Sequence, residues 1–185
     1  MSTRDKLLEL ANTLIQKNGY EGFSYADLAR ELGIRKASIH HHFPAKSDLG
    51  LAYCESKREA FSVLEAQILA LPAGPAQLQA YLEAFSGCAR DDEMCGVYAM
   101  LSDSNLFPPE LKTAVSELAG YELRILADIL QRGRDAGTLT FSTSARDMAM
   151  IVCNALKGAL LLNRTPPHDA CDHTVKALMQ QLSTL

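Results

Sequence analysis

Residues 35–46 carry side chains that can hydrogen-bond the phosphates and base edges of duplex DNA. Cations open the segment, three histidines follow in succession, and no Asp or Glu occurs between Glu31 and Asp48. Guanidinium, ammonium, hydroxyl and imidazole groups donate to phosphate oxygens, and several of them also reach base edges in the major groove. The candidate DNA-binding residues of this segment are Arg35, Lys36, Ala37, Ser38, His40, His41, His42 and Lys46.

The preceding residues predict the first helix and the turn of a helix-turn-helix, which would position these groups. Ser24 is a favourable N-cap, and Asp27 stands three residues later, where a capping-box acid belongs. Phe23 and Leu28 can form a hydrophobic staple across that cap. Gly33 then ends the helix, because glycine reaches positive φ without a Cβ penalty.

A second helix is predicted from about residue 35 or 36 to Phe43, with its polar side outward. Ile39 and Phe43 are its inward positions, Ile34 packs at the turn, and Pro44 prevents the helix from continuing. The second helix of such a motif enters the DNA major groove. A solvated basic face is the alternative, but cap, staple, turn and core positions agree with the DNA-binding interpretation.

The three successive histidines also raise the question of a metal site. Helical neighbours point about 100° apart, so three in a row do not close on one ion. Imidazoles that donate to phosphates are the better interpretation, and DNA binding should then tighten as the pH falls and the histidines gain protons.

The run G-I-R-K-A-S-I-H-H-H-F at residues 33–43, followed by P-A-K-S-D-L at 44–49, resembles the TetR family of bacterial transcriptional regulators. The resemblance implies that Lys36, Ala37 and His41 face bases. It also implies that a helix over about residues 3–18 supports the pair, with Arg4 near the DNA backbone. The resemblance assigns Ser38, His40, His42 and Lys46 to phosphates. Ser24 and Arg35 are further candidate DNA-binding residues.

Two positions depart from the usual pattern of this family. His40 stands where tyrosine is usual, and Arg35 stands where a serine-like cap is common. Both residues are still donors, so the resemblance continues to imply DNA binding, but it does not transfer an operator sequence.

Composition limits the class of protein. The chain has 185 residues, 48% of them hydrophobic, so it can bury a core as one large or two small domains. No apolar run is long enough for a transmembrane helix, and the charged N-terminus lacks the apolar core of a signal peptide. Five cysteines without Cys-x-x-Cys pairs argue against a disulfide framework or a zinc module, and favour the reducing cytoplasm.

The net charge of −4 is unevenly divided along the chain. Residues 1–50 hold seven Lys/Arg against six Asp/Glu, and the other 135 residues hold eleven against sixteen. The second part is therefore repelled by phosphate, which orients the molecule and weakens non-specific binding.

The chain beyond residue 46 predicts helices only, and hence an all-α protein. We expect a DNA-binding domain over residues 1–48 with three helices, and a TetR-like helical domain for effector binding and dimerisation over 49–185. No alternating strand pattern persists. The expected helices cover about 47–71, 75–90, 94–104, 109–136, 144–163 and 169–182.

The helix expected at 144–163 is apolar nearly all round, so it must be covered on more than one side. Small residues at Ala155, Gly158 and Ala159 would allow close packing of a neighbouring helix. An ordinary monomer core is one explanation. The resemblance implies another: the last two helices form a four-helix interface across a two-fold axis, which places two recognition helices about 34 Å apart.

The central helices are expected to hold an unidentified small-molecule effector, although any one of their apolar residues could simply be core. Residues 88–103 also look like the segment of the TetR branch that senses electrophiles and unsaturated acids. By this resemblance Cys95 is the sensing cysteine. Asp91, Asp92 and Glu93 oppose its thiolate, and Lys157 would compensate if it points inward. The alternative is a buried structural cysteine. The candidate ligand-binding residues are Tyr81, Phe85, Cys95, Tyr98, Tyr121, Ile125 and Lys157.

The sequence thus predicts a ligand-responsive, dimeric repressor that binds double-stranded DNA, without a cofactor or a membrane partner. No nucleophile–base pairing or metal-ligand spacing supports an enzyme. A thiol-based switch protein and a helical adaptor without sequence-specific DNA binding are the alternatives.

Overall fold

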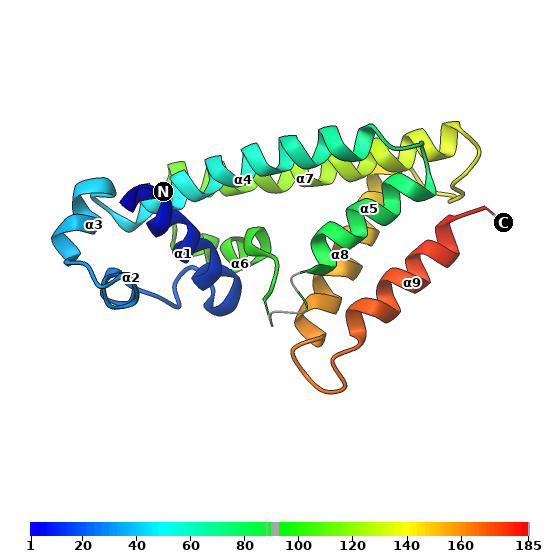
Figure 1. Ribbon diagram of the computed structural model, residues 1–185. Coiled ribbons are helices and arrows are strands. Elements are labelled where there is room, and N and C mark those ends of the chain that lie inside the picture. The colour runs from blue at the N-terminus through cyan, green and yellow to red at the C-terminus, as the bar shows by residue number, and fades with distance from the viewer. Residues whose placement is uncertain (88, 90–92, 185) are drawn as a thin grey trace. The chain divides into compact units, whose positions relative to one another are not determined.

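The computed structural model describes residues 1–87, 89 and 93–184, and this part of the chain is almost entirely helical (Figure 1). Its β-structure is confined to one isolated bridge between Leu139 and Ser183. None of the described helices is long and apolar enough to cross a membrane. The predicted all-α class is confirmed.

The helices lie close to their predicted positions, with α5 ending earlier than expected. Residues 87 and 89 follow it in 3₁₀ geometry, and residues 88 and 90 lie outside the described part. The helices are α1 (Thr3–Asn18), α2 (Tyr25–Leu32), α3 (Lys36–His42), α4 (Lys46–Leu69), α5 (Pro75–Ser86), α6 (Gly96–Asp103), the 3₁₀ helix η2 (Ser104–Leu106), α7 (Pro109–Asp135), α8 (Ala145–Leu162) and α9 (Ala170–Leu182).

The chain forms two compact units. The first contains Met1–Glu59 and Gly96–Ala119, and the second contains Ala60–Cys95 and Gly120–Leu185. The helices α4 and α7 therefore each contribute to both units. The expected functional division at residues 48 and 49 remains a prediction.

The first unit contains the predicted helix-turn-helix. The capping box of α2 is confirmed: Ser24 Oγ accepts from the helix backbone, and the Asp27 carboxylate accepts from Ser24 N–H at 2.8 Å. Gly33 ends α2 in the left-handed region, with φ 64°. Ile39 is fully buried, and Phe43 is nearly so, which leaves the opposite face of α3 outward.

The start of α6 packs closely against α1 and α4 within the first unit. A Cβ added to Gly96 would lie 2.0 Å from the Tyr53 hydroxyl and 3.4 Å from Cγ of Gln16. A side chain at this position would have to displace the Tyr53 hydroxyl. The chain after α6 continues the same packing, because the Phe107 ring lies 4.8 Å from that of Tyr20.

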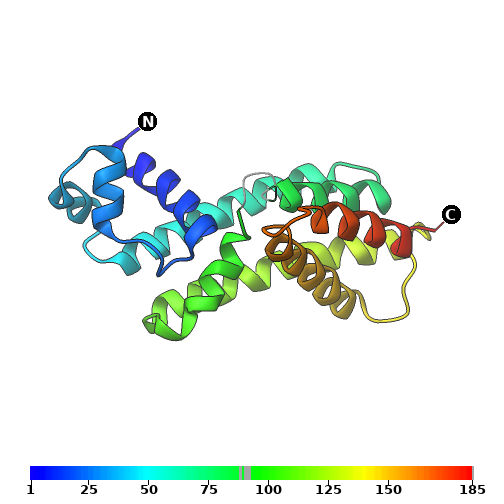
Figure 2. The same ribbon diagram turned by 90° about the horizontal axis from the view of Figure 1, so that it is seen from below.

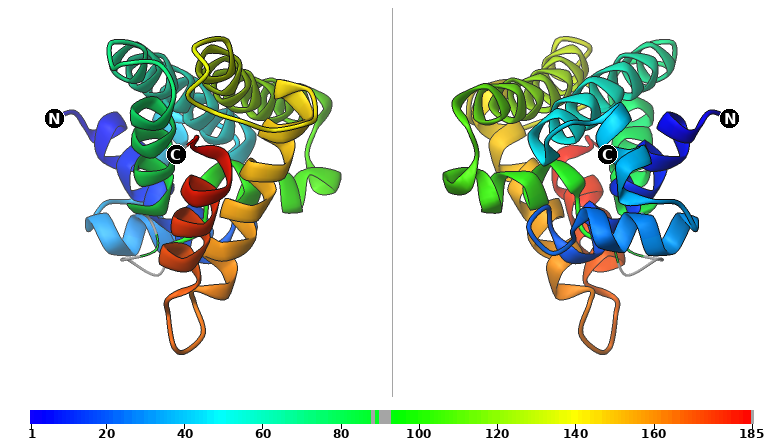
Figure 3. Two further views of the ribbon diagram at one scale, coloured as in Figure 1. Left: turned by 90° about the vertical axis from the view of Figure 1, so that its right-hand side faces the viewer. Right: turned by 90° about the vertical axis from the view of Figure 1, so that its left-hand side faces the viewer.

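The second unit is built on contacts among α5, α8 and α9, and α8 and α9 form an antiparallel pair (Figures 1 and 3). Its core includes Leu78, Leu82, Val152 and Leu156, each with no exposed surface. Gly137 ends the turn after α7 at φ 69°. The buried polar side chains described below come from α5, α7 and α8 of this unit.

Candidate nucleic-acid interface and buried polar cluster

In the first unit, α2 and α3 lie side by side (Figure 2). The outward face of α3 carries the side chains predicted to contact DNA. The tetrapeptide Arg35–Ser38 is exposed, as are His40 and His41, whereas His42 is half-buried. Because no acid lies between Glu31 and Asp48, this face presents donors without a competing carboxylate. Its composition suits contact with phosphates and base edges.

His40 is held by its surroundings in the first unit. Its Nδ1 lies 3.0 Å from the Pro44 carbonyl oxygen, and its ring packs edge-on against Tyr25 at 5.0 Å. Donation from Nδ1–H to this carbonyl leaves Nε2 as the outward nitrogen. The Tyr25 hydroxyl donates to the carbonyls of Phe43 and Ala45 at 2.9 and 2.7 Å, and so fixes the turn after α3.

Lys46 occupies a partly buried place that the sequence does not predict. Its ammonium lies over the rings of Tyr20 and Phe23, at 4.5 and 4.7 Å, and 3.7 Å from Glu21 Oε2. Burial lowers the pKa of Lys46, while the nearby carboxylates of Glu21 and Asp103 act in the opposite direction. Lys46 is therefore a structural cation of the first unit as well as a predicted phosphate contact.

Two candidate DNA contacts, Arg4 and Ser24, lie outside residues 35–46 and have different neighbours. Arg4 is exposed, and its guanidinium carbon lies 5.3 Å from the centre of the Phe43 ring, which places it beside the end of α3. Ser24 is exposed but caps α2, and its hydroxyl donates to Asp27 Oδ2 at 2.7 Å. Among the described residues, no group of His, Cys, Asp and Glu could hold a metal ion.

The second unit contains a buried polar cluster that joins three helices. Lys157 of α8 lies 2.6 Å from Glu122 Oε1 of α7, and their side chains are 3% and 1% exposed. The Tyr81 hydroxyl of α5 donates to the same oxygen at 3.2 Å. The thiol of Cys153 lies 3.9 Å from it.

The charges of this cluster depend on one another. Burial alone would lower the pKa of Lys157, but Cys95, Glu122 and Cys153 outweigh it and raise that pKa above its ordinary value. The lysine thus stays protonated. Burial, helped by Glu122, raises the pKa of Tyr81 well above its usual range, so this hydroxyl remains a donor.

Aromatic rings adjoin the ion pair. The Lys157 ammonium lies 3.8 Å from the centre of the Phe85 ring, and the Tyr81 and Phe85 rings are 4.7 Å apart. Phe61 packs against Phe85 at 5.8 Å. Phe61 also contacts Tyr121 at 6.3 Å.

The structure brings together most of the predicted ligand-binding residues. Tyr81, Phe85 and Lys157 are in direct contact, and Cys95 is near enough to influence the Lys157 charge. Tyr121 donates to Glu65 Oε2 at 2.7 Å, and Ile125 is buried in the second unit. Tyr98 belongs to the first unit. Asp91 and Asp92 lie outside the described residues.

Glu122 is the central residue that the sequence analysis missed. It stands four residues after Leu118 and three before Ile125, within the apolar stripe of α7. An acid on an apolar stripe must find a buried partner or become neutral. That pattern was the available signal for a buried partner of Glu122, but it does not identify which residue the partner is.

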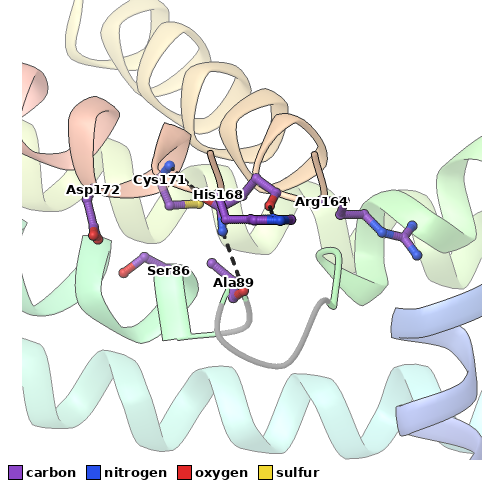
Figure 4. Close-up of a pocket in the computed structure, with 7 residues that line it drawn as sticks. Ser86, Ala89, Arg164, His168, Cys171 and Asp172 are labelled. Carbon is purple, nitrogen blue, oxygen red and sulfur yellow. Dashed lines mark hydrogen bonds between the residues drawn. The ribbon is translucent and has the colours of Figure 1, made fainter. Parts of the chain in front are cut away.

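A separate pocket of about 540 Å³ opens beside the start of α9 (Figure 4). Asn163 bridges its walls, because its Oδ1 accepts from Cys171 N–H at 3.1 Å. The Arg164 side chain points away from the other labelled residues. None of the predicted ligand-binding residues lines it. The lining residues are Ser86, Ala89, Asn163, Arg164, His168, Cys171 and Asp172.

One face of α8 is apolar and exposed in the single chain. Met150, Ile151, Leu161 and Leu162 are 43, 52, 54 and 66% exposed. A Cβ added to Gly158, in the middle of this face, would meet no atom within 4 Å. This face of α8 is therefore left uncovered by the described part of the single chain.

An outward, donor-bearing α3 held by a buried Ile39–Phe43 face defines the first unit as a helix-turn-helix DNA-binding module. Residues 7–53 match the family model for bacterial regulatory proteins of the tetR family. A TetR-family transcriptional regulator from Agrobacterium tumefaciens has a solved structure that is 30% identical, with a TM-score of 0.90. The match covers 98% of this chain and 97% of that one.

Two curated regulators are also similar. The HTH-type transcriptional regulator LmrA of Bacillus subtilis is 25% identical over 168 residues, which is 88% of this chain and 87% of LmrA. The IcaR negative regulator of the icaADBC biofilm operon from Staphylococcus aureus is 37% identical over 46 residues, a quarter of each chain. The chain belongs to the TetR family of bacterial transcriptional regulators. Members of this family are DNA-binding regulators and not enzymes.

Proposed function

We propose that this protein is a ligand-responsive repressor that binds a palindromic operator as a homodimer and acts in the cytoplasm. The observation that carries the proposal is the α3 face, where exposed donors from Arg35 to His41 stand opposite a buried Ile39. Such a face supplies both phosphate contacts and base readout.

Base readout is assigned to Lys36, Ala37 and His41. All three side chains are exposed on α3. Lysine donates to guanine acceptors, and alanine accommodates a thymine methyl group. The phosphate contacts are assigned to the residues around them. These are Arg4, Ser24, Arg35, Ser38, His40, His42 and Lys46.

The apolar face of α8 is proposed as the dimer interface. Exposed leucine, isoleucine and methionine side chains on one helix favour burial against a self-complementary copy. Gly158 leaves room for a partner helix to approach closely. Dimerisation would present two α3 helices to successive major grooves of a palindrome, about 34 Å apart.

The polar cluster of Tyr81, Phe85, Glu122 and Lys157 is proposed as the centre of effector recognition. Glu122 Oε2 is buried without a hydrogen-bond partner among the described residues, and an unpaired buried acceptor is unfavourable. An effector that donates to this oxygen would remove that penalty. Tyr121 and Ile125 of the same unit are further proposed effector contacts. Tyr98, in the first unit, stays a predicted ligand-binding residue.

An electrophile is the second candidate effector, because the buried Cys95 is near enough to influence the charge of Lys157. Cysteine is the side chain that electrophiles modify most readily. Under this proposal, Cys95→Ser abolishes release of DNA by an electrophile such as N-ethylmaleimide. Equal release from the substituted protein would leave the non-covalent effector as the remaining proposal.

The experiment that tests the function is selection of bound duplexes from a random DNA pool, followed by affinity measurements across salt concentrations. We expect an inverted-repeat sequence and an affinity that falls steeply with ionic strength. The adaptor alternative predicts no enriched sequence and no complex even at low salt. That result would overturn the proposal.

A further inference from the structure

The geometry points to Asp103 as a positioning residue for the helix-turn-helix. Asp103 is the last residue of α6, and its Oδ2 accepts a hydrogen bond from the backbone N–H of Glu21 at 3.0 Å. Glu21 lies in the short connection between α1 and α2. A side chain 82 positions away in the sequence therefore holds the connection that sets where α2 begins.

The fit at this connection is close. A Cβ added to Gly19 would lie 3.4 Å from the same Asp103 oxygen, and Gly19 has φ 82°. Glycine allows the chain to turn there and to approach the carboxylate. The glycine at position 19 thus leaves room for the Asp103 carboxylate to approach the backbone.

Tyr20, next to Glu21, links this connection to the chain that follows α3. Tyr20 packs its ring against Phe107, which follows α6 and η2, and its hydroxyl donates to the Lys46 carbonyl at 2.6 Å. Lys46 begins α4 directly after the turn that follows α3. Residues 103–107 therefore hold the connection at 19–21, and that connection holds the chain at the end of the recognition helix.

The charge of Asp103 decides how a change in DNA affinity is interpreted. Asp103 lies close enough to Lys46 to favour its protonated form. Removing an acid from a DNA-binding unit strengthens the attraction to phosphate if nothing else changes. A loss of affinity on removal of Asp103 would therefore report lost positioning and not lost charge.

The test compares three full-length variants that each remove one negative charge. Asp103→Ala removes the acceptor, Asp103→Asn keeps an acceptor oxygen for Glu21 N–H, and Glu59→Ala removes an exposed acid elsewhere in the same unit. The probe is the duplex selected by the wild-type protein. Its affinity is measured over a range of salt concentrations, with protein concentrations corrected for the folded fraction by urea titration.

We expect Asp103→Ala to bind about tenfold more weakly, with a shallower salt dependence because fewer phosphates are neutralised. Asp103→Asn should stay within about threefold of wild type, and Glu59→Ala should bind at least as tightly as wild type. A merely structural role would change the folded fraction but leave the salt slope unaltered. If the alanine variant does not fold, Asp103→Ser replaces it, because a serine hydroxyl is too short to reach Glu21 N–H.

Two results would overturn the inference. One is wild-type affinity in the folded Asp103→Ala or Asp103→Ser protein. The other is an equal loss in Asp103→Asn, which would show that the hydrogen bond is not what matters. Failure of the wild-type protein to select any duplex is a different outcome, since it would overturn the proposed function as well.

Discussion

The ammonium of Lys157 lies 2.6 Å from Oε1 of Glu122, and both side chains are almost completely buried in the second unit. The two residues come from different helices and are joined by no local sequence feature. A buried ion pair stabilises only while both partners are present, because either charge alone is left without compensation. This pair is thus a point where the packing of α7 against α8 can be tested.

Replacing one partner of the pair should strongly destabilise the protein. Lys157→Met leaves the Glu122 carboxylate buried without its cation, and we expect a loss of about 3–5 kcal/mol in the free energy of unfolding. Urea denaturation at neutral pH measures it. The control is the double variant Glu122→Leu with Lys157→Met, which should recover most of the loss because no charge remains. Equal losses in both proteins would show that the pair has no specific role.

Lys36 and Lys46 should affect DNA binding in different ways. Lys36→Ala removes a proposed base contact, so we expect a loss of about 1–3 kcal/mol that is largest for the selected operator. Lys46→Ala should weaken all sequences about equally, and it should also lower the urea midpoint because the Tyr20 and Phe23 rings lose their cation.

Binding titrations with the operator and with scrambled duplexes separate the two effects. Lys112→Ala, an exposed lysine of the same unit, serves as the matched control and should leave sequence preference unchanged. If Lys36→Ala weakened binding to the operator and to scrambled duplexes equally, Lys36 would not be a base contact.

The capping box of α2 should make stability depend on acid pH. Hydrogen bonds from Ser24 and Arg30 lower the pKa of Asp27 to about 2. A depressed folded-state pKa contributes stability above the ordinary aspartate value of about 4, and this contribution is lost as the pH falls towards 2.

Asp27→Asn should therefore be less stable than wild type near neutral pH, with a difference that narrows below about pH 4. Urea midpoints at pH 6, 4 and 3 measure this. Ser24→Ala removes the hydroxyl that holds the same carboxylate. The stability difference between this variant and wild type should narrow at low pH in the same way. A difference that is constant across these pH values would contradict the capping role.

The exposed face of α8 should control assembly. Ile151→Glu places a charge on the apolar face, and we expect it to convert a dimer into a monomer in light scattering, since a buried unpaired charge is strongly unfavourable. Operator affinity should fall with it, because the two half-sites are then bound independently. Ser56→Glu adds the same charge to an exposed site on α4 and should leave the mass unchanged. A monomeric wild-type protein would refute the interface.

The helix-turn-helix was predictable because its signals are local. Ser24, Asp27 and Gly33 act within one or two helical turns, and the inward spacing of Ile39 and Phe43 follows from helix geometry alone. The same reasoning located the ends of α2 and α3, whereas the bounds of α1 came from the family resemblance. The exposure of Lys36 and His41 followed from these positions without any knowledge of the rest of the fold.

The contacts between distant segments were decided by tertiary packing. Periodicity shows that a residue is buried but not what it meets, so the pairing of Glu122 with Lys157 and the acceptance by Asp103 from Glu21 N–H were not predictable. Lys46 carries a charge that suits phosphate, yet the neighbouring aromatic rings draw its ammonium inward. Local hydrogen bonds and caps depend on nearby residues, whereas the partners of buried polar groups depend on how whole helices come together.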